Sequence, residues 1–425
     1  MTIQIRTTNA LEILDSRGRP TLSVSLTLTD GLTCTAGVPA GASTGSGEAV
    51  EVRDGDLRRY GGRGVRSAVA NVTGPIRAAL AGRTFGDLAE LDETLRSLDG
   101  TPDKARLGAN AIVGVSMAAA RAFAAAADQP LWRYLTPPGV APALPVPHFN
   151  VVNGGVHAPN PLDFQEFMLA PVGAPDMAEA VRAGAEVYAV LRARLAAAGH
   201  ATGLGDEGGF APDLTRPEEV LDALVDAIVA AGYQPGPEGV AIALDPAASQ
   251  FHRDGAYHVA GRAMSSAELV DHYAELIDRY PIRSLEDGLA EDDWDGWDRL
   301  TERLGDRVQI VGDDIFVTDP EIIADAARRG VGNAALVKVN QIGTVTETLE
   351  AFRVCRETGY AAMVSHRSGE TLDTFIADLA VGSGCGQLKS GAPARGERVA
   401  KYNRLLEIAE QAPDLPYARI SRSRT

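Results

Sequence analysis

Apolar and polar side chains alternate along residues 3–38, in the runs TLSVSLTLTDG and LTCTAGV. A period of two, with a DG turn between the runs, predicts an antiparallel meander of strands. Residues 65–80, 87–98 and 108–127 instead predict helices, and the last of these is rich in alanine, which favours close helix packing. The first third of the chain is therefore expected to be a small α+β domain.

A proline-rich segment, TPPGVAPALPVP at residues 136–147, separates this region from the rest of the chain. Its prolines disfavour both helix and central strand, so we place the domain boundary there, with domains 1–136 and 137–425. Beyond it, strand-like runs alternate with amphipathic helices, which predicts an eightfold TIM-type β/α barrel. The predicted helices include residues 177–199, 218–232, 266–280, 320–330, 344–359 and 370–384.

Three acidic residues each follow a short apolar run of this second region: Asp245 after AIAL, Glu286 after IRSL and Asp313 after VQIVG. A similar run, ALV, precedes Lys338. Because the carboxyl ends of barrel strands meet at one mouth, this spacing predicts one shared site. Oxygen ligands select a hard cation such as Mg²⁺, and a lysine beside it is a candidate base. The alternative is that these residues cap helices or pair with arginines.

Composition narrows the classes of function. The 425 residues carry a formal net charge of −17, which disfavours binding to nucleic acid or anionic membranes. The chain has no uninterrupted run of 18 apolar residues and begins without a signal-peptide pattern. Cys34, Cys355 and Cys385 form no CxxC pair, so neither a disulfide framework nor a zinc site is expected. We expect a cytoplasmic protein that concentrates positive charge locally for any anionic substrate.

Further candidates lie in glycine-rich and polar motifs of the second domain. Glycines around GDEGGF suggest tight turns that let the backbone approach a ligand. The neighbouring arginine and serine of SHRSGE offer a forked donor and a hydroxyl, which suit a phosphate. Each motif alone is also compatible with a surface turn or a structural histidine. The candidates are His157, Glu166, Glu207, His366, Arg367, Ser368 and Lys389.

Taken together, the motifs resemble the enolase family over about residues 9 to 410. The motifs that carry the resemblance are DSRGRPT, AGASTGSGEA, RDGD, GANAI, NGGVHA, QEF, GDEGGFAP, LDPAAS, SLEDGLAEDDWDGW, VGDDIFVT, VNQIGT, SHRSGET and APARGERVAKYN. This resemblance implies an α+β N-terminal domain before a β/α barrel of variant topology. It also implies reversible dehydration of 2-phosphoglycerate to phosphoenolpyruvate.

The resemblance also implies ligands for two Mg²⁺ ions. The ligands of the first ion would be Asp245, Glu286 and Asp313, and Ser43 in the loop at residues 40–48, a mobile lid, would bind the second. Enolase-superfamily sites use a Lys or His base with one or two Mg²⁺, so the role of Lys338 as base is implied rather than independently derived. That base is expected to need a lowered pKa.

The remaining roles follow in the same way. Glu207, with Glu166 nearby, would protonate the departing 3-hydroxyl, and repulsion between the two carboxylates is expected to favour the protonated form of Glu207. Arg367 and Ser368 would bind the phosphate. The substrate carboxylate would meet Lys389, and His157 and His366 would line the closed site.

Some positions depart from the family pattern. Ser23 replaces a typical Glu and Glu407 a typical Arg, a pair that tends to meet across a homodimer interface, so the strength of any homo-oligomer is left open. Arg19, Ala40 and Gly396 also depart from the usual residues. Two alternatives remain: a paralogue of specialised metabolism that acts on a phosphonate or phosphinate analogue, and a non-catalytic binding protein on the same fold.

Overall fold

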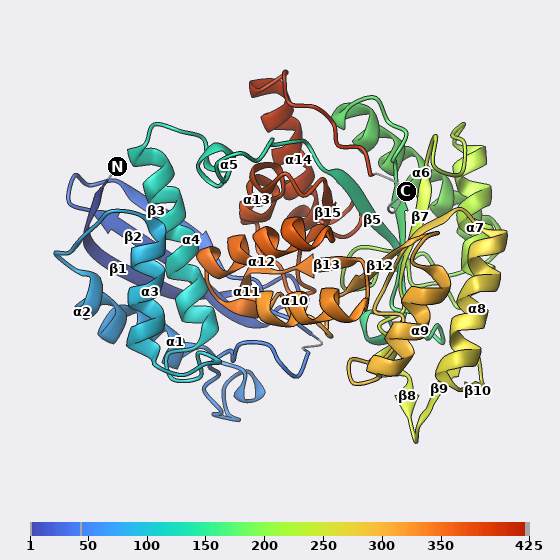
Figure 1. Cartoon of the computed structure of the whole chain (residues 1–425), viewed down its shortest axis with the longest axis horizontal. Helices are drawn as coiled ribbons and strands as arrows, with labels where there is room; N and C mark the ends of the chain where they lie inside the picture. The colour runs from blue at the N-terminus through green and yellow to red at the C-terminus, as the bar shows by residue number, and fades with distance from the viewer. Residues whose placement is uncertain (1, 43–44, 421–425) are drawn as a thin grey trace.

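A computed structural model describes residues 2–42 and 45–420 of the chain. Figure 1 shows a sheet with covering helices at one side and a barrel ringed by helices at the other. The N-terminal sheet has the antiparallel order β3-β2-β1-β4. The predicted meander is therefore confirmed. Its strands are β1 Ile3–Leu14, β2 Pro20–Leu28, β3 Thr33–Gly37 and β4 Thr84–Phe85.

The N-terminal helices cover one face of this sheet, and α4 lies closest to it. A Cβ at Gly114 of α4 would lie 2.5 Å from a methyl of Val24, so glycine permits this close approach. The helices are α1 Arg66–Asn71, α2 Arg77–Leu80, α3 Leu88–Asp99, α4 Ala109–Ala126 and α5 Leu131–Tyr134. The expected single helix at 65–80 is interrupted by a π-helical turn, η2 Val72–Ile76, because Pro75 lacks the backbone N–H that a regular helix needs.

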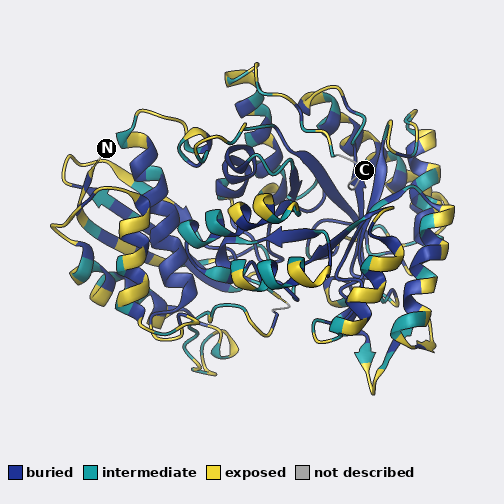
Figure 2. Ribbon diagram, viewed as in Figure 1, coloured by how far each residue is buried: buried dark blue, intermediate teal, exposed yellow. Residues whose placement is uncertain are grey.

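Helix α4 is long and apolar enough to cross a membrane by length and composition alone. However, 83% of that stretch is buried inside the fold. Figure 2 shows the same helix largely dark blue where it faces the sheet. It is the central core helix of the N-terminal domain.

The second region forms a closed barrel in the order β11-β12-β13-β14-β15-β5-β6-β7. Strand β6 runs antiparallel to both neighbours and the other described pairs are parallel. Its core is buried (Figure 2). The strands are β5 Val146–Asn153, β6 Glu166–Ala170, β7 Ala241–Asp245, β11 Ile282–Glu286, β12 Gln309–Gly312, β13 Ala334–Val337, β14 Ala361–Ser365 and β15 Gln387–Lys389.

Helices pack around this barrel, and a small antiparallel sheet projects from it (Figure 1). The sheet consists of β8 His252–Arg253, β9 Ala256–Val259 and β10 Arg262–Met264. The helices are α6 Met177–Ala197, α7 Pro217–Ala230, α8 Ser266–Arg279, α9 Trp294–Leu304, α10 Pro320–Arg329, α11 Val339–Ile342, α12 Val345–Thr358, α13 Phe375–Ser383 and α14 Gly396–Gln411.

One predicted helix begins later than expected. Residues 370–384 were expected to be helical, but α13 starts only at Phe375. The reason lies in Glu370, whose carboxylate accepts hydrogen bonds from the backbone N–H groups of Arg367 and Thr371 and from buried Lys401. These contacts hold the segment as a loop at the barrel mouth.

The N-terminal domain reaches over that mouth. The backbone of Ala40 pairs with Gly369 after β14, and Ala49 N–H donates to the carbonyl of Gln341 after β13. Asn340 donates to the carbonyl of Pro39. Residues on both sides of the predicted lid are thus fixed to the barrel. Its central residues, Ser43 and Thr44, lie outside the described residues, so the predicted role of Ser43 stays a prediction.

Candidate active site at the barrel mouth

The acidic residues and the lysine singled out from the sequence do occupy strand ends. Asp245 and Glu286 are the last residues of β7 and β11, while Asp313 and Lys338 directly follow β12 and β13. Lys389 ends β15 in the same way. Because these strands are parallel, all five side chains gather at one end of the barrel.

Glu166 reaches the same mouth from the opposite chain direction. It is the first residue of β6, and it pairs in register with Asp245 because β6 is antiparallel to β7. Reversing the strand therefore puts its beginning where the other strands end.

The ammonium of Lys389 lies among three buried carboxylates. Its Nζ is 2.7 Å from Glu286, 3.1 Å from Asp245 and 3.3 Å from Glu166. Burial alone would lower the pKa of Lys389, but these three carboxylates raise it well above its usual value. Lys389 is thus a fixed positive charge at the centre of an acidic mouth.

Lys338 contacts Asp313 directly, and Gln341 donates to the other Asp313 oxygen at 2.8 Å. The lowered pKa that Lys338 would need as a base beside bound cations stays a prediction, and the protein groups around it act on its pKa in opposite directions. Burial is the largest influence and lowers the pKa of Lys338, but the carboxylates around it, Asp313 foremost and then Glu286, together raise the pKa above its usual value. The lysine can become a neutral base only when that carboxylate is neutralised.

The donors at the mouth fit a hard cation. One oxygen of Glu286 and one of Glu166 are buried without a hydrogen-bond partner among the described residues, and Asp245 and Asp313 add further carboxylate oxygens at neighbouring strand ends. The groups whose ligand atoms lie within 4.8 Å of one another are His157, Glu166 and Glu207, and Asp287, Asp313 and Asp314. Among the described residues, the implied triad of Asp245, Glu286 and Asp313 does not form such a group. Asp245 and Glu286 contact Lys389, whereas Asp313 contacts Lys338.

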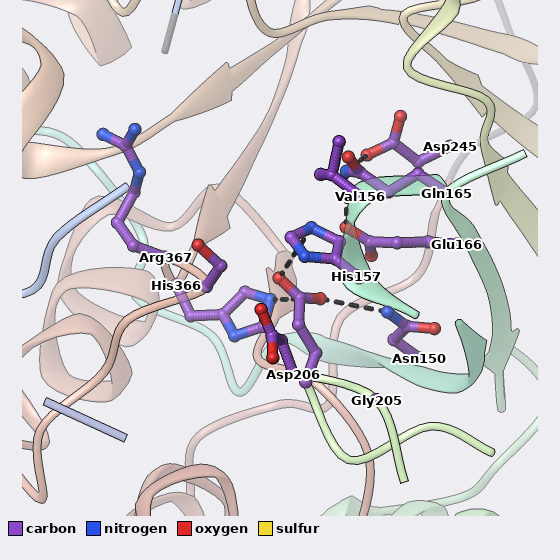
Figure 3. A network of polar contacts seen from close by, with 12 residues as sticks. Asn150, Val156, His157, Gln165, Glu166, Gly205, Asp206, Asp245, His366 and Arg367 are labelled. Carbon is purple, nitrogen blue, oxygen red and sulfur yellow. Dashed lines mark hydrogen bonds and ion pairs between the residues drawn. The ribbon is translucent and has the colours of Figure 1, made fainter. Parts of the chain in front are cut away.

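Glu207 lies in a loop of close-packed glycines. Its partners Asn150, His157 and His366 come together in Figure 3. One of its oxygens, Oε2, accepts from Asn150 at 3.0 Å and lies 3.3 Å from His366 Nε2. The other, Oε1, lies 3.5 Å from His157 Nε2. The expected tight turn is present, since Gly208 has a φ of +89° and a Cβ there would lie 3.1 Å from the carbonyl of Ala394.

The two glutamates of the mouth differ in proton affinity. Glu207 was expected to favour its protonated form, but its pKa is lowered. Burial and the negative charge of Glu207 raise the pKa of Glu166 well above its usual value. Burial also opposes ionisation of Glu207, but His366, His157 and Arg398 outweigh it and lower its pKa. Glu166 is the proton holder in this structure. Burial lowers the pKa of His366 to about 4, so this imidazole is neutral at neutral pH.

The predicted phosphate-binding pair is also at the mouth, with contacts the motifs did not reveal. Both terminal nitrogens of Arg367 donate to Glu48, at 2.9 and 3.0 Å, and the pair is buried. Ser368 Oγ accepts from Arg17 at 3.0 Å, and Arg17 also donates to the carbonyls of Ala40 and Gly41 beside the lid. These two partners tie the phosphate-binding candidates to the N-terminal domain.

Residues that the role assignment missed share one property: they act on another side chain rather than on a ligand. They are Arg17, Glu48, Asn150, Gln341 and Arg398. Arg17, Glu48, Gln341 and Arg398 lie inside motifs quoted for the family resemblance, which was the one available signal.

The two residues that depart from the family pattern at the expected dimer interface, Ser23 and Glu407, both make contacts within the single chain. Ser23 pairs with Leu11 and Gly37 in the sheet, and Glu407 accepts from Arg404 at 3.2 Å. These contacts lie within one chain and do not test whether two chains associate. The oligomeric state therefore stays a prediction.

Comparisons with known proteins agree with this arrangement. The family model "Enolase, N-terminal domain" matches residues 5–135, and "Enolase, C-terminal TIM barrel domain" matches residues 141–422. The chain is 56% identical over 410 residues to "Enolase" of Acidothermus cellulolyticus, covering 96% of this chain and 95% of the relative. It is 57% identical over 401 residues to "Enolase" of Rubrobacter xylanophilus, covering 94% and 93%. The chain belongs to the enolase family.

Proposed function

We propose that this chain is a phosphopyruvate hydratase, a lyase of glycolysis that interconverts 2-phosphoglycerate and phosphoenolpyruvate with release of water. The observation that carries the proposal is the convergence of Lys338 and three strand-end carboxylates at one end of the barrel, in a pocket that Glu207 also lines. The identity of more than half the residues to curated enolases over nearly the whole chain supports it.

The reaction breaks the C2–H bond and the C3–O bond of the substrate, and the C–H electron pair becomes the new double bond. We assign Lys338 as the base that accepts the C2 proton. Glu207, assisted by Glu166, supplies a proton to the departing 3-hydroxyl, so that water leaves. Glu166 is the natural reservoir, because its pKa is raised and its carboxylate lies within 4.8 Å of the Glu207 ligand atom.

The substrate anions have complementary partners. Lys389 is placed to bind the carboxylate, and Arg367 with Ser368 the phosphate, at a mouth where both lysine and arginine are buried and held by acidic residues. His157 and His366 flank Glu207 and line the same side of the site.

The family uses Mg²⁺, and we propose Asp245, Glu286 and Asp313 as its ligands, with Ser43 for a second ion. Bound Mg²⁺ would supply positive charge to the substrate carboxylate, which becomes more negative when the C2 proton leaves. Neutralising Asp313 is also what Lys338 needs to lose its own proton at neutral pH.

Turnover of 2-phosphoglycerate by the full-length protein with Mg²⁺ tests this function. We expect a kcat in the ordinary enzyme range, about 1–1000 s⁻¹, followed as phosphoenolpyruvate absorbance. The same preparation with the chelator EDTA is the control. A rate far below this range, with faster turnover of a phosphonate or phosphinate analogue, would assign the chain to specialised metabolism instead.

A further inference from the structure

A buried arginine outside the reacting groups organises the acid side of the mouth. Arg398, in the first turn of α14, is fully buried. Its guanidinium donates to His366 Nδ1 at 2.5 Å, to the carbonyls of Arg367 and Ser368 at 2.7 Å each, and to the carbonyl of Asp206 at 3.2 Å. It thus contacts both loops that carry the proposed proton donor and phosphate ligands.

The contact with His366 determines where that imidazole carries its proton. An arginine guanidinium stays protonated and can only donate hydrogen bonds. Nδ1 of His366 must therefore be the unprotonated, accepting nitrogen. In the neutral ring the single proton then lies on Nε2.

Nε2 faces Glu207, so the tautomer decides which Glu207 oxygen can take a proton. Oε2 lies 3.3 Å from His366 Nε2, although the N–H is not aligned with it in this conformation, and it also accepts from Asn150 at 3.0 Å. Two N–H groups facing one carboxylate oxygen disfavour a proton on that oxygen. Oε1, beside His157, is left as the oxygen that can be protonated.

We propose that Arg398 is a positioning residue that fixes His366 in the Nε2–H tautomer and thereby directs the exchangeable proton of Glu207 to Oε1. This inference rests on the proposed role of Glu207 as proton donor. In the opposite tautomer, His366 would present a lone pair to Oε2 and draw the Glu207 proton to the wrong oxygen.

The second histidine beside Glu207 provides an internal comparison. Within the described part of the chain, His157 Nδ1 is buried with no hydrogen-bond partner, so no donor comparable to Arg398 fixes its tautomer there. Both rings are buried and both approach Glu207 through Nε2. Arg398 is the feature that separates them.

The first test reads the tautomer in the wild-type protein. In protein labelled with ¹⁵N-histidine, we expect His366 to show a protonated Nε2 and an unprotonated Nδ1 across neutral pH, with the signals assigned by loss in His366→Gln. A protonated Nδ1 on His366 would overturn the proposal. This result does not depend on turnover, so a protein inactive on 2-phosphoglycerate would remove the proposed function while leaving the tautomer measurable.

The second test asks whether Arg398 acts through His366. In Arg398→Met we expect a mixed His366 tautomer and a kcat lower by about 10- to 100-fold, the range found when an outer partner of a functional histidine is removed. Exchange of the C2 proton with solvent, assigned to Lys338, should persist. Arg398→Lys, which restores a donor and the charge, should recover part of kcat.

The control is the same substitution in a His366→Gln background. If Arg398 acts through His366, Arg398→Met should add little to the loss of kcat already caused by His366→Gln. If the two substitutions instead lower kcat by independent factors that multiply, the proposal is contradicted. It is also contradicted if the folded Arg398→Met variant loses C2 exchange as well, because Arg398 would then have a merely structural role. If Arg398→Met does not fold, the wild-type ¹⁵N measurement decides alone, since a protonated Nδ1 on His366 would overturn the proposal.

Discussion

The two sides of the barrel mouth stabilise their buried charged groups in different ways. On one side, carboxylates at strand ends are balanced by the ammonium groups of Lys338 and Lys389. On the other, Glu207 lies in a loop, accepts a hydrogen bond from the neutral amide of Asn150 and is flanked by two histidines. We call these the lysine side and the histidine side.

The difference teaches how one pocket can hold a base and an acid together. Fixed charges on the lysine side create a strong local electric field. A bound cation or substrate anion changes that field and with it the pKa values of the groups there. Neutral donors on the histidine side adjust where a proton lies without adding net charge. The account therefore assigns proton removal to the lysine side and proton delivery to the histidine side.

The largest expected effect comes from removing the base. Lys338→Ala should lower turnover by at least about 10²–10⁴-fold, since the proton acceptor is lost. Exchange of the C2 proton of 2-phosphoglycerate with solvent deuterium, followed by NMR, should disappear with it. Mg²⁺ binding should persist, because the strand-end carboxylates remain. Retained C2 exchange in this variant would take the role of base away from Lys338.

A smaller effect is expected from neutralising one proposed ligand. Glu286→Gln keeps the shape of the side chain but removes the charge from an oxygen that has no hydrogen-bond partner. We expect Mg²⁺ affinity, measured by calorimetry, to fall by about 100-fold, since ligand charge sets affinity over decades. Exposed Glu321→Gln is the control. Unchanged affinity would place the ion elsewhere in the mouth.

A still smaller effect should follow from removing the negative charge that contacts Arg367, the proposed phosphate ligand. Glu48→Gln removes the charged partner that orients the Arg367 fork. A charge-assisted hydrogen bond contributes about 1.5–3 kcal/mol, so we expect KM for 2-phosphoglycerate to rise by roughly 10-fold with kcat little changed. Steady-state kinetics measure both. A lower KM would mean that Glu48 competes with the phosphate for Arg367.

No effect on turnover is expected from a contact far from both sides of the mouth. Asp92 of α3 accepts from the backbone N–H and hydroxyl of Thr346 at the start of α12, at 3.0 and 2.6 Å, and so joins the N-terminal domain to the barrel. Burial raises its pKa to about 6. The folded state therefore binds this proton more tightly than the unfolded state, and the stability this gives is lost as pH rises from about 4 to about 6.

Asp92→Asn removes this titration. Relative to wild type, the variant should gain about 2 kcal/mol in unfolding free energy between pH 4 and pH 7, since pH 4 already lies near the unfolded pKa of 3.8 and the folded pKa is about 6. Urea unfolding at both pH values measures it, with exposed Asp298→Asn as control. A wild-type to variant difference that does not change with pH would contradict the raised pKa of Asp92.

The strand-end residues could be predicted because a local pattern specifies them. An apolar run followed by a carboxylate, repeated at strand-plus-helix intervals, brought Asp245, Glu286 and Asp313 to one end of the barrel. The antiparallel meander was equally visible as a period of two.

The contacts between side chains could not be predicted in that way. The position of Lys389 among three carboxylates depends on barrel closure, which joins β15 to β5. Arg398 reaches His366 from a helix 32 residues further along the chain, and no periodicity indicates that contact. The pKa of Glu207 was expected to be raised by Glu166, but it is lowered for the same reason: histidines and an arginine that only the fold brings near outweigh burial.

The measurement that tests the division of the mouth most directly is C2 hydrogen exchange in Glu207→Gln. Gln keeps the size of the side chain and cannot deliver a proton to the 3-hydroxyl. If the lysine side removes the C2 proton independently, this variant should exchange C2 hydrogen with solvent deuterium while forming almost no phosphoenolpyruvate. Loss of exchange together with loss of product would show that the two sides do not act separately.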